Sequence, residues 1–278
     1  MAQAPFKHGR KLCVFCGNPA NSGEHIWPKW AHELIPEVSG HKQVVFEGPV
    51  TRDVMSRVYD RDRQGSVAKV AIRRVCNTCN NGWMSEYESK AKAMLTAMMM
   101  GRNLALGVDS QRLLGEYFTL KLMVLDWTAA DPIFSQEERT AFLDGRCIPV
   151  GIKLNIAFCP DHRMSSYYRT HFQEASDVNR LAEHLPGRNV KTFAVGFGGI
   201  FLFALCIKND AADLKLEPRQ GWFQLLPAKL PLVYWPPFLA ISRDEAETVA
   251  SSLGALTEHA RVKVADDVVG AISKIIGG

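Results

Sequence analysis

The spacing of apolar residues predicts several helices. From Asn80 to Met100 apolar side chains recur every three or four positions, which predicts a helix that ends at Gly101. The same criterion predicts four helices further along the chain, over residues 111–128, 136–143, 244–253 and 264–275.

Continuous apolar runs predict strands in the second half of the chain. They cover residues 149–158, 190–197, 200–207 and 220–226. The sequence Phe197-Gly198-Gly199-Ile200 joins two of these runs, and a hairpin turn explains it better than a phosphate-binding loop.

The first hundred residues have a different pattern. Residues 22–28, 43–47 and 67–75 are expected to be extended, and the polar, basic stretch 51–66 is expected to be a loop. We therefore predict an α+β protein. Its N-terminal module comprises residues 1–101, and a separate α/β domain follows over 102–278.

Composition and charge suit a soluble protein that approaches phosphates. The chain is 47% hydrophobic with a net charge of +4, and no apolar run is long enough to span a membrane. The N-terminus lacks the apolar core of a signal peptide, so we expect a cytoplasmic location. Residues 1–101 hold 14 basic and 9 acidic residues, against 19 and 20 in the remainder. The excess positive charge thus lies in the N-terminal module, where it would suit nucleic acid or simply a solvated surface.

Four of the seven cysteines form two CxxC pairs, Cys13/Cys16 and Cys76/Cys79. A cytosolic chain seldom keeps structural disulfides, and four thiolates from two turns make the tetrahedral cage of a structural zinc site. The other three cysteines, Cys147, Cys159 and Cys206, occur singly and are expected to be small core residues.

The order of motifs resembles the HNH, or ββα-metal, nuclease family. The residues that carry the resemblance are the two CxxC pairs, the string Glu24-His25-Ile26-Trp27-Pro28 between them, and Asn80 directly after the second pair. It covers roughly residues 10 to 100. A basic residue and a glycine often follow this asparagine in the family, whereas this chain has Asn81-Gly82-Trp83.

The resemblance implies an endonuclease that hydrolyses DNA phosphodiester bonds. Glu24 and Asn80 would hold one divalent cation, and His25 would be the general base, as its reference pKa of about 6.5 allows. Oxygen ligands of this kind suit Mg²⁺ or Mn²⁺. The zinc would fix Glu24 and His25 relative to Asn80. The alternative role for Asn80 is to cap the helix. Glu88 is expected to form a structural salt bridge, and Trp27, Trp30 and Trp83 are expected to pack in the core.

Other features concern partners and the second domain. A set of arginines in the module is expected to contact DNA phosphates. They are Arg52, Arg57, Arg61, Arg63, Arg73 and Arg74. The alternative is that these arginines are only solvated surface charges. A homodimer would be the simple arrangement if both strands are cut. Residues 102–278 would serve target selection, dimerisation or regulation. The alternative is a catalytically idle zinc module that binds nucleic acid or protein.

Overall fold

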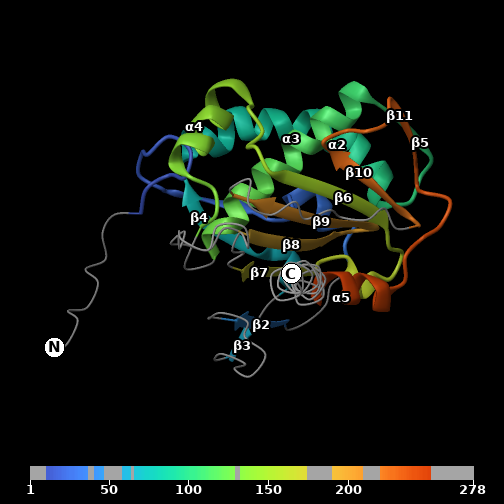
Figure 1. Cartoon of the computed structure of the whole chain (residues 1–278). Helices are drawn as coiled ribbons and strands as arrows, with labels where there is room; N and C mark the ends of the chain where they lie inside the picture. Colours follow the sequence, from blue (N-terminus) through green and yellow to red (C-terminus); the bar gives the residue numbers. More distant parts are fainter. Residues whose placement is uncertain are drawn as a thin grey trace, which may run out of the picture.

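A five-stranded antiparallel sheet forms the centre of the molecule. The computed structural model describes residues 11–36, 41–46, 58–63, 66–128, 132–173, 190–208 and 220–251 (Figure 1). It mixes helix and sheet, as predicted. The central sheet has the strand order β10-β6-β9-β8-β7. Its strands are β6 (Ile152–Phe158), β7 (Tyr168–Gln173), β8 (Val190–Phe197), β9 (Ile200–Ile207) and β10 (Trp222–Leu226).

Both faces of this sheet are covered by helices. Figure 1 shows α3 (Val108–Leu125) and α5 (Arg243–Ser251) on opposite sides of it. Along β9, Leu202 and Ala204 belong to the core beneath α3, whereas Phe201 and Phe203 pack with Ala246 of α5. Every residue of β8 and β9 is buried for this reason, which explains their uninterrupted apolar sequences.

The N-terminal half contains a strand pair followed at once by a helix. Strand β1 (Ser22–His25) pairs antiparallel with β4 (Ala71–Val75), with Glu24 opposite Ile72 and His25 opposite Ala71. After β4 come α1 (Asn77–Cys79), a π-helical turn η3 (Asn80–Met84) and α2 (Ser85–Met99). The predicted helix is therefore confirmed, although helical structure begins three residues earlier.

Gly101 ends α2, as predicted. Its φ of +65° lies in the left-handed region, which glycine adopts without strain. Its backbone N–H donates to Met98 and that of Arg102 donates to Ala97, at 3.0 and 2.9 Å. These two bonds satisfy carbonyls at the helix end, which have no N–H partner from a following helical turn.

The remaining elements are short. They are the helical segments η1 (Lys29–Ala31), η2 (Val67–Lys69), η4 (Asp126–Thr128), α4 (Gln136–Gly145) and η5 (His162–Met164), and the strands β2 (His41–Phe46), β3 (Val58–Arg63), β5 (Leu104–Gly107) and β11 (Leu232–Trp235). β2 pairs with β3, and β5 with β11, both antiparallel.

Several local predictions were wrong. Residues 58–63 form a strand rather than part of a loop, because β2 supplies a partner in register along the whole of β3. Cys147 is exposed, whereas Cys159 and Cys206 are buried as predicted. Cys147 follows Arg146, whose left-handed backbone (φ 57°) turns the chain at the end of α4. The predicted helix over 264–275 lies outside the described residues.

The two halves of the chain share one hydrophobic core. Trp27, Met98, Leu106, Phe197 and Trp235 are all buried in it, and they lie on both sides of residue 101. The indole nitrogen of Trp235 donates to the carbonyl of Met98 at 3.0 Å. A domain boundary at residue 101 stays a prediction, but it would cut through this packing. Among the described residues, no helix combines the length and apolar character needed to cross a bilayer.

Candidate functional site

The four cysteines of the CxxC pairs meet at one point. The sulfur atoms of Cys13, Cys16, Cys76 and Cys79 all lie within 4.8 Å of one another, and the Sγ atoms of Cys16 and Cys76 are 3.5 Å apart. A tetrahedron of sulfurs ~2.3 Å from zinc has edges of ~3.8 Å, so the group fits this ion. All four cysteines are free thiols, which leaves them available as ligands. The cluster could hold a metal ion such as zinc.

Local backbone structure places the sulfurs. Gly17 closes the first turn with a φ of +73°, a conformation that a residue with a Cβ adopts only with strain, and its N–H donates to the carbonyl of Cys13 at 3.0 Å. Cys76 caps α1, and its sulfur accepts the backbone N–H of Cys79 at 3.4 Å. The cluster therefore joins the loop before β1 to the start of the helix after β4.

Asn80 lies against the strand that carries Glu24 and His25. Its Nδ2 atom donates to Ser22 Oγ at 2.7 Å and to the carbonyl of Gly23 at 3.4 Å. Because a carbonyl can only accept, the amide nitrogen must face β1, and this fixes the orientation of the side chain. The Oδ1 atom has no hydrogen-bond partner among the described residues. Asn80 thus connects the helix to β1 and keeps one oxygen available.

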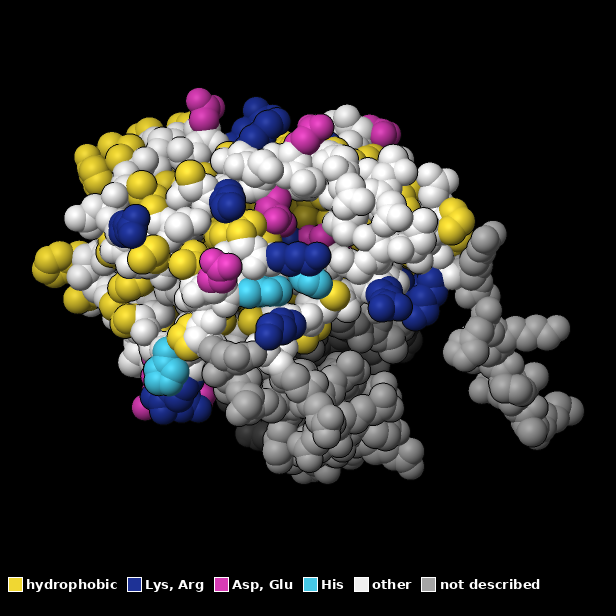
Figure 2. Space-filling view, turned by 180° about the vertical axis from the view of Figure 1, so that it is seen from behind, with side chains coloured by type: hydrophobic (Ala, Val, Ile, Leu, Met, Phe, Trp, Pro, Cys, Tyr) yellow, Lys and Arg dark blue, Asp and Glu magenta, His cyan; other side chains and the backbone are white. Residues whose placement is uncertain are grey.

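His25 forms part of a histidine pair. Its ring stacks on that of His32, with centroids 5.4 Å apart and an interplanar angle of 21°. Figure 2 shows histidine side chains on this face of the molecule, with basic and acidic side chains near them. The His32 Nε2 atom is 2.9 Å from the carbonyl of Trp27, whereas His25 Nδ1 is buried without a partner in the described part of the chain.

The surroundings of His25 favour its neutral form. Burial lowers the pKa of His25 and the nearby His32 and Lys121 lower it further, while Glu24 opposes them. A neutral imidazole carries a lone pair that can accept a proton. The lowered pKa fits a general base, because it keeps the imidazole neutral near physiological pH.

Glu24 is paired with a lysine from the second half of the chain. Both side chains are buried, and Lys121 Nζ on α3 contacts Glu24 Oε1. The same nitrogen is 3.0 Å from the carbonyl oxygen of His25 and 3.6 Å from Glu88 Oε2. Burial alone would lower the pKa of Lys121, but Glu24, Tyr117 and Glu88 outweigh it and raise that pKa. The predicted salt bridge of Glu88 is therefore confirmed, with Lys121 as its partner.

Glu24 and Asn80 each offer an oxygen atom of the kind that a hard divalent cation binds. Glu24 Oε2 and Asn80 Oδ1 have no hydrogen-bond partner among the described residues. Carboxylate and amide oxygens are ligands that Mg²⁺ and Mn²⁺ accept, with water or phosphate filling the remaining positions. Glu24 and Asn80 therefore fit such an ion in chemical type, although Lys121 already neutralises one oxygen of Glu24.

Sequence reasoning did not find Lys121. In the helix that covers the sheet, residues 114–125 are all buried, and Lys121 lies among them. A lone lysine in such an apolar stretch was the available signal, because a buried ammonium needs an acidic partner. The sequence alone does not say that this partner is Glu24.

The predicted phosphate-binding arginines are only partly described. Arg52 and Arg57 lie outside the described residues, and Arg61 and Arg63 belong to β3, but their side chains are outside them too. Two others lie on β4 next to the cysteine cluster. Arg73 is exposed, and Arg74 is half-buried with its guanidinium 4.9 Å from the Trp127 ring centroid.

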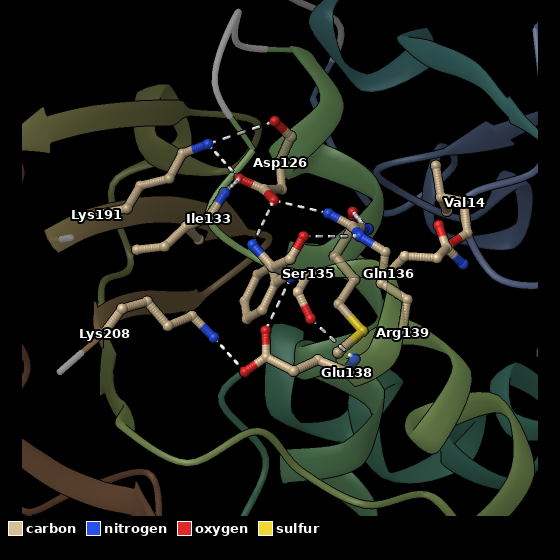
Figure 3. A network of polar contacts seen from close by, with 11 residues as sticks. Val14, Asp126, Ile133, Ser135, Gln136, Glu138, Arg139, Lys191 and Lys208 are labelled. Atoms are coloured by element: carbon tan, nitrogen blue, oxygen red, sulfur yellow. Dashed lines mark hydrogen bonds and ion pairs between the residues drawn. The ribbon is translucent and has the colours of Figure 1, made fainter. Parts of the chain in front are cut away.

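Helix α4 supports the first cysteine turn from behind. Gln136 Nε2 donates to the carbonyl of Val14 at 3.3 Å (Figure 3). It also donates to the carbonyl of Phe15 at 3.3 Å. Phe15 in turn packs edge-on against Trp83, with centroids 5.1 Å apart. Trp83 is half-buried and Trp27 fully buried, so the prediction that these tryptophans pack in the core is confirmed for both, as it is for Trp30.

A buried ionic network holds α4 against α3 and the sheet. The carboxylate of Asp126 accepts the backbone N–H groups of Ile133 and Phe134 at 3.1 Å, and it pairs with Arg139 and Lys191 (Figure 3). Burial lowers the pKa of Arg139 to about 10, against the attraction of Asp126. This network fixes the helix whose Gln136 reaches the cysteine turn.

Comparison with known proteins does not identify a relative. No family model, no curated protein and no solved structure matches the chain.

Proposed function

We propose that this protein is a metal-dependent endonuclease of the ββα-metal type that hydrolyses DNA phosphodiester bonds. His25 is its general base, and Glu24 and Asn80 hold one Mg²⁺ or Mn²⁺ ion. Cys13, Cys16, Cys76 and Cys79 hold a structural zinc ion.

One observation carries the proposal: Asn80 is bonded to the strand that carries Glu24 and His25. Its hydrogen bonds to Ser22 and Gly23 join the start of the helix to β1. The cysteine cluster joins the loop before β1 to the same helix start, at Cys79 next to Asn80. A loop-rich module needs such links to hold ligands within a fraction of an ångström.

The roles of the residues follow from the reaction. His25 takes a proton from the attacking water, for which its lowered pKa is suited. When bound, the divalent cation supplies positive charge for the developing oxyanion and the leaving oxygen. Glu24 and Asn80 hold that ion, and basic side chains such as the exposed Arg73 contact the phosphate backbone.

The experiment is cleavage of supercoiled plasmid by the zinc-loaded protein. We expect nicked or linear DNA with Mg²⁺ or Mn²⁺ and intact plasmid when divalent cation is omitted. Zinc content is measured in both samples, so that loss of the structural ion is not mistaken for loss of the catalytic one. Intact plasmid in every metal, with zinc retained, would contradict the proposal.

The ion pair between Lys121 and Glu24 favours a second candidate. If Lys121 permanently satisfies this carboxylate, the module binds nucleic acid or a protein partner without cutting it. In that case duplex binding is measurable and unaffected by Mg²⁺, and no product forms. Binding and cleavage measured on the same labelled duplex separate the two candidates.

A further inference from the structure

We propose that Lys121 is a positioning residue that competes with the divalent cation for Glu24 and thereby sets the cation concentration at which the enzyme works. This inference rests on the proposed function, because it takes Glu24 as a ligand of the catalytic ion. It adds a residue from the second half of the chain to the active site.

The ammonium group of Lys121 lies among oxygen atoms, as a bound cation would. It contacts Glu24 Oε1, and it is 3.0 Å from the His25 carbonyl and 3.6 Å from Glu88 Oε2. Its side chain is only 9% exposed, as is that of Glu24, so water screens their interaction little. The Tyr117 ring lies beneath it, with the nitrogen 5.5 Å from the centroid.

Charge determines how Lys121 affects a second cation. Lys121 carries one positive charge between two carboxylates, Glu24 and Glu88, and leaves this group with a net charge of about −1. Without Lys121 the same group would attract a divalent cation more strongly, because like charges repel in a poorly solvated site. Lys121 therefore weakens binding of the ion.

Hydrogen bonding gives Lys121 a second, opposite effect. It fixes Glu24 through Oε1 and the backbone of the proposed base through the His25 carbonyl. Glu24 Oε2 remains without a partner among the described residues, so the carboxylate is held with one oxygen available. Loss of these contacts leaves both residues less well oriented for the reaction, which lowers the rate once the ion is bound.

The two effects give a signature that a purely structural residue would not produce. Lys121→Met should bind Mn²⁺ about tenfold more tightly or better, because one neighbouring positive charge is gone. At saturating Mn²⁺ it should cut DNA roughly 10- to 100-fold more slowly, the usual cost of losing a residue that orients metal ligands. A residue needed only for folding would weaken both binding and cleavage.

The test is direct titration of the zinc-loaded full-length protein with Mn²⁺, followed by electron paramagnetic resonance, alongside plasmid cleavage. Lys208→Met is the control, because Lys208 also forms an ion pair with a glutamate, the half-buried Glu138, away from this site. The control should match the wild type in both assays. Tighter Mn²⁺ binding with slower cleavage in Lys121→Met alone supports the proposal; unchanged or weaker binding overturns it.

Two further variants keep the outcomes separate. If Glu24→Gln abolishes Mn²⁺ binding while Lys121→Met leaves it unchanged, the metal site stands and only the role of Lys121 falls. If Glu24→Gln binds Mn²⁺ as the wild type does, both proposals fail.

Should Lys121→Met not fold, Glu88→Gln is the variant to measure. With Glu88 neutral, Lys121 pairs with Glu24 alone, and Mn²⁺ binding should weaken several-fold. Unchanged binding in Glu88→Gln would overturn the proposal.

Discussion

The indole nitrogen of Trp27 donates a hydrogen bond of 2.7 Å to the carbonyl of Gly196, although 169 residues separate the two in sequence. Trp27 follows the Glu24-His25 pair by two residues, and Gly196 lies on the fully buried strand β8. This bond attaches the strand end that carries the proposed base to the central sheet. The sheet thus supports the candidate site directly.

Replacement of Trp27 should destabilise the whole protein. Trp27→Phe removes the hydrogen bond and leaves unfilled space in the core, which should lower the free energy of unfolding by about 2–4 kcal/mol. Urea denaturation measures the change. Trp222→Phe is the matched control, because the buried indole nitrogen of Trp222 has no partner among the described residues. Equal losses for the two variants would show that the bond to Gly196 contributes little.

Removal of a cluster cysteine should release the metal. Cys79→Ser is expected to lose zinc and to melt at a lower temperature, because the closed site needs four thiolates. Elemental analysis of the purified protein should give about one zinc ion per chain for the wild type and for Cys147→Ser, whose exposed thiol lies outside the cluster. Full zinc content in Cys79→Ser would exclude the cysteine cage.

Asn80 should matter for activity more than for stability. Asn80→Ala removes the proposed oxygen ligand and the hydrogen bonds to Ser22 and Gly23, which water can replace. We therefore expect cleavage to fall roughly 10- to 100-fold. Asn77→Ala, one turn earlier and exposed, is the control. Initial rates at several Mn²⁺ concentrations check the prediction. A variant that cuts at the wild-type rate would remove Asn80 from the site.

The buried carboxylate of Asp126 should be essential for folding. Asp126→Ala leaves Arg139 and Lys191 buried beside the lost carboxylate and two backbone N–H groups unpaired, at a cost of about 3–5 kcal/mol. Asp144→Ala, on the exposed side of α4, should cost far less. Chemical denaturation of both variants tests this, and similar stabilities would show that the network is dispensable.

The sequence predicted elements with strong periodic signals and missed those defined by distant partners. Strands β8 and β9 match their predicted limits, because both are uniformly apolar and bounded by the Gly198-Gly199 turn. Strands β5 and β11 were missed. Each is four residues long, and each is a strand only because the other lies beside it, more than a hundred residues away in the chain.

In the candidate site, too, locally encoded features were predicted and contacts between distant segments were missed. Motif spacing predicted the cysteine cluster, because two CxxC turns carry their own local geometry and need only to meet. The pairing of Lys121 with Glu24 depends on how α3 packs against β1, and no local pattern encodes this. The assignments of Glu24, His25 and Asn80 to catalysis stay predictions until cleavage is measured.

If His25 activates water, its replacement should abolish cleavage, and the decisive measurement compares His25→Ala with His162→Ala on one labelled duplex. His162 is exposed and lies far from His25 in sequence, so its variant controls for the loss of a histidine. Binding is measured in Ca²⁺ and cleavage in Mg²⁺ or Mn²⁺. We expect both variants to bind the duplex like the wild type and only His25→Ala to fail to cut. Equal cleavage rates for His25→Ala and His162→Ala would contradict it.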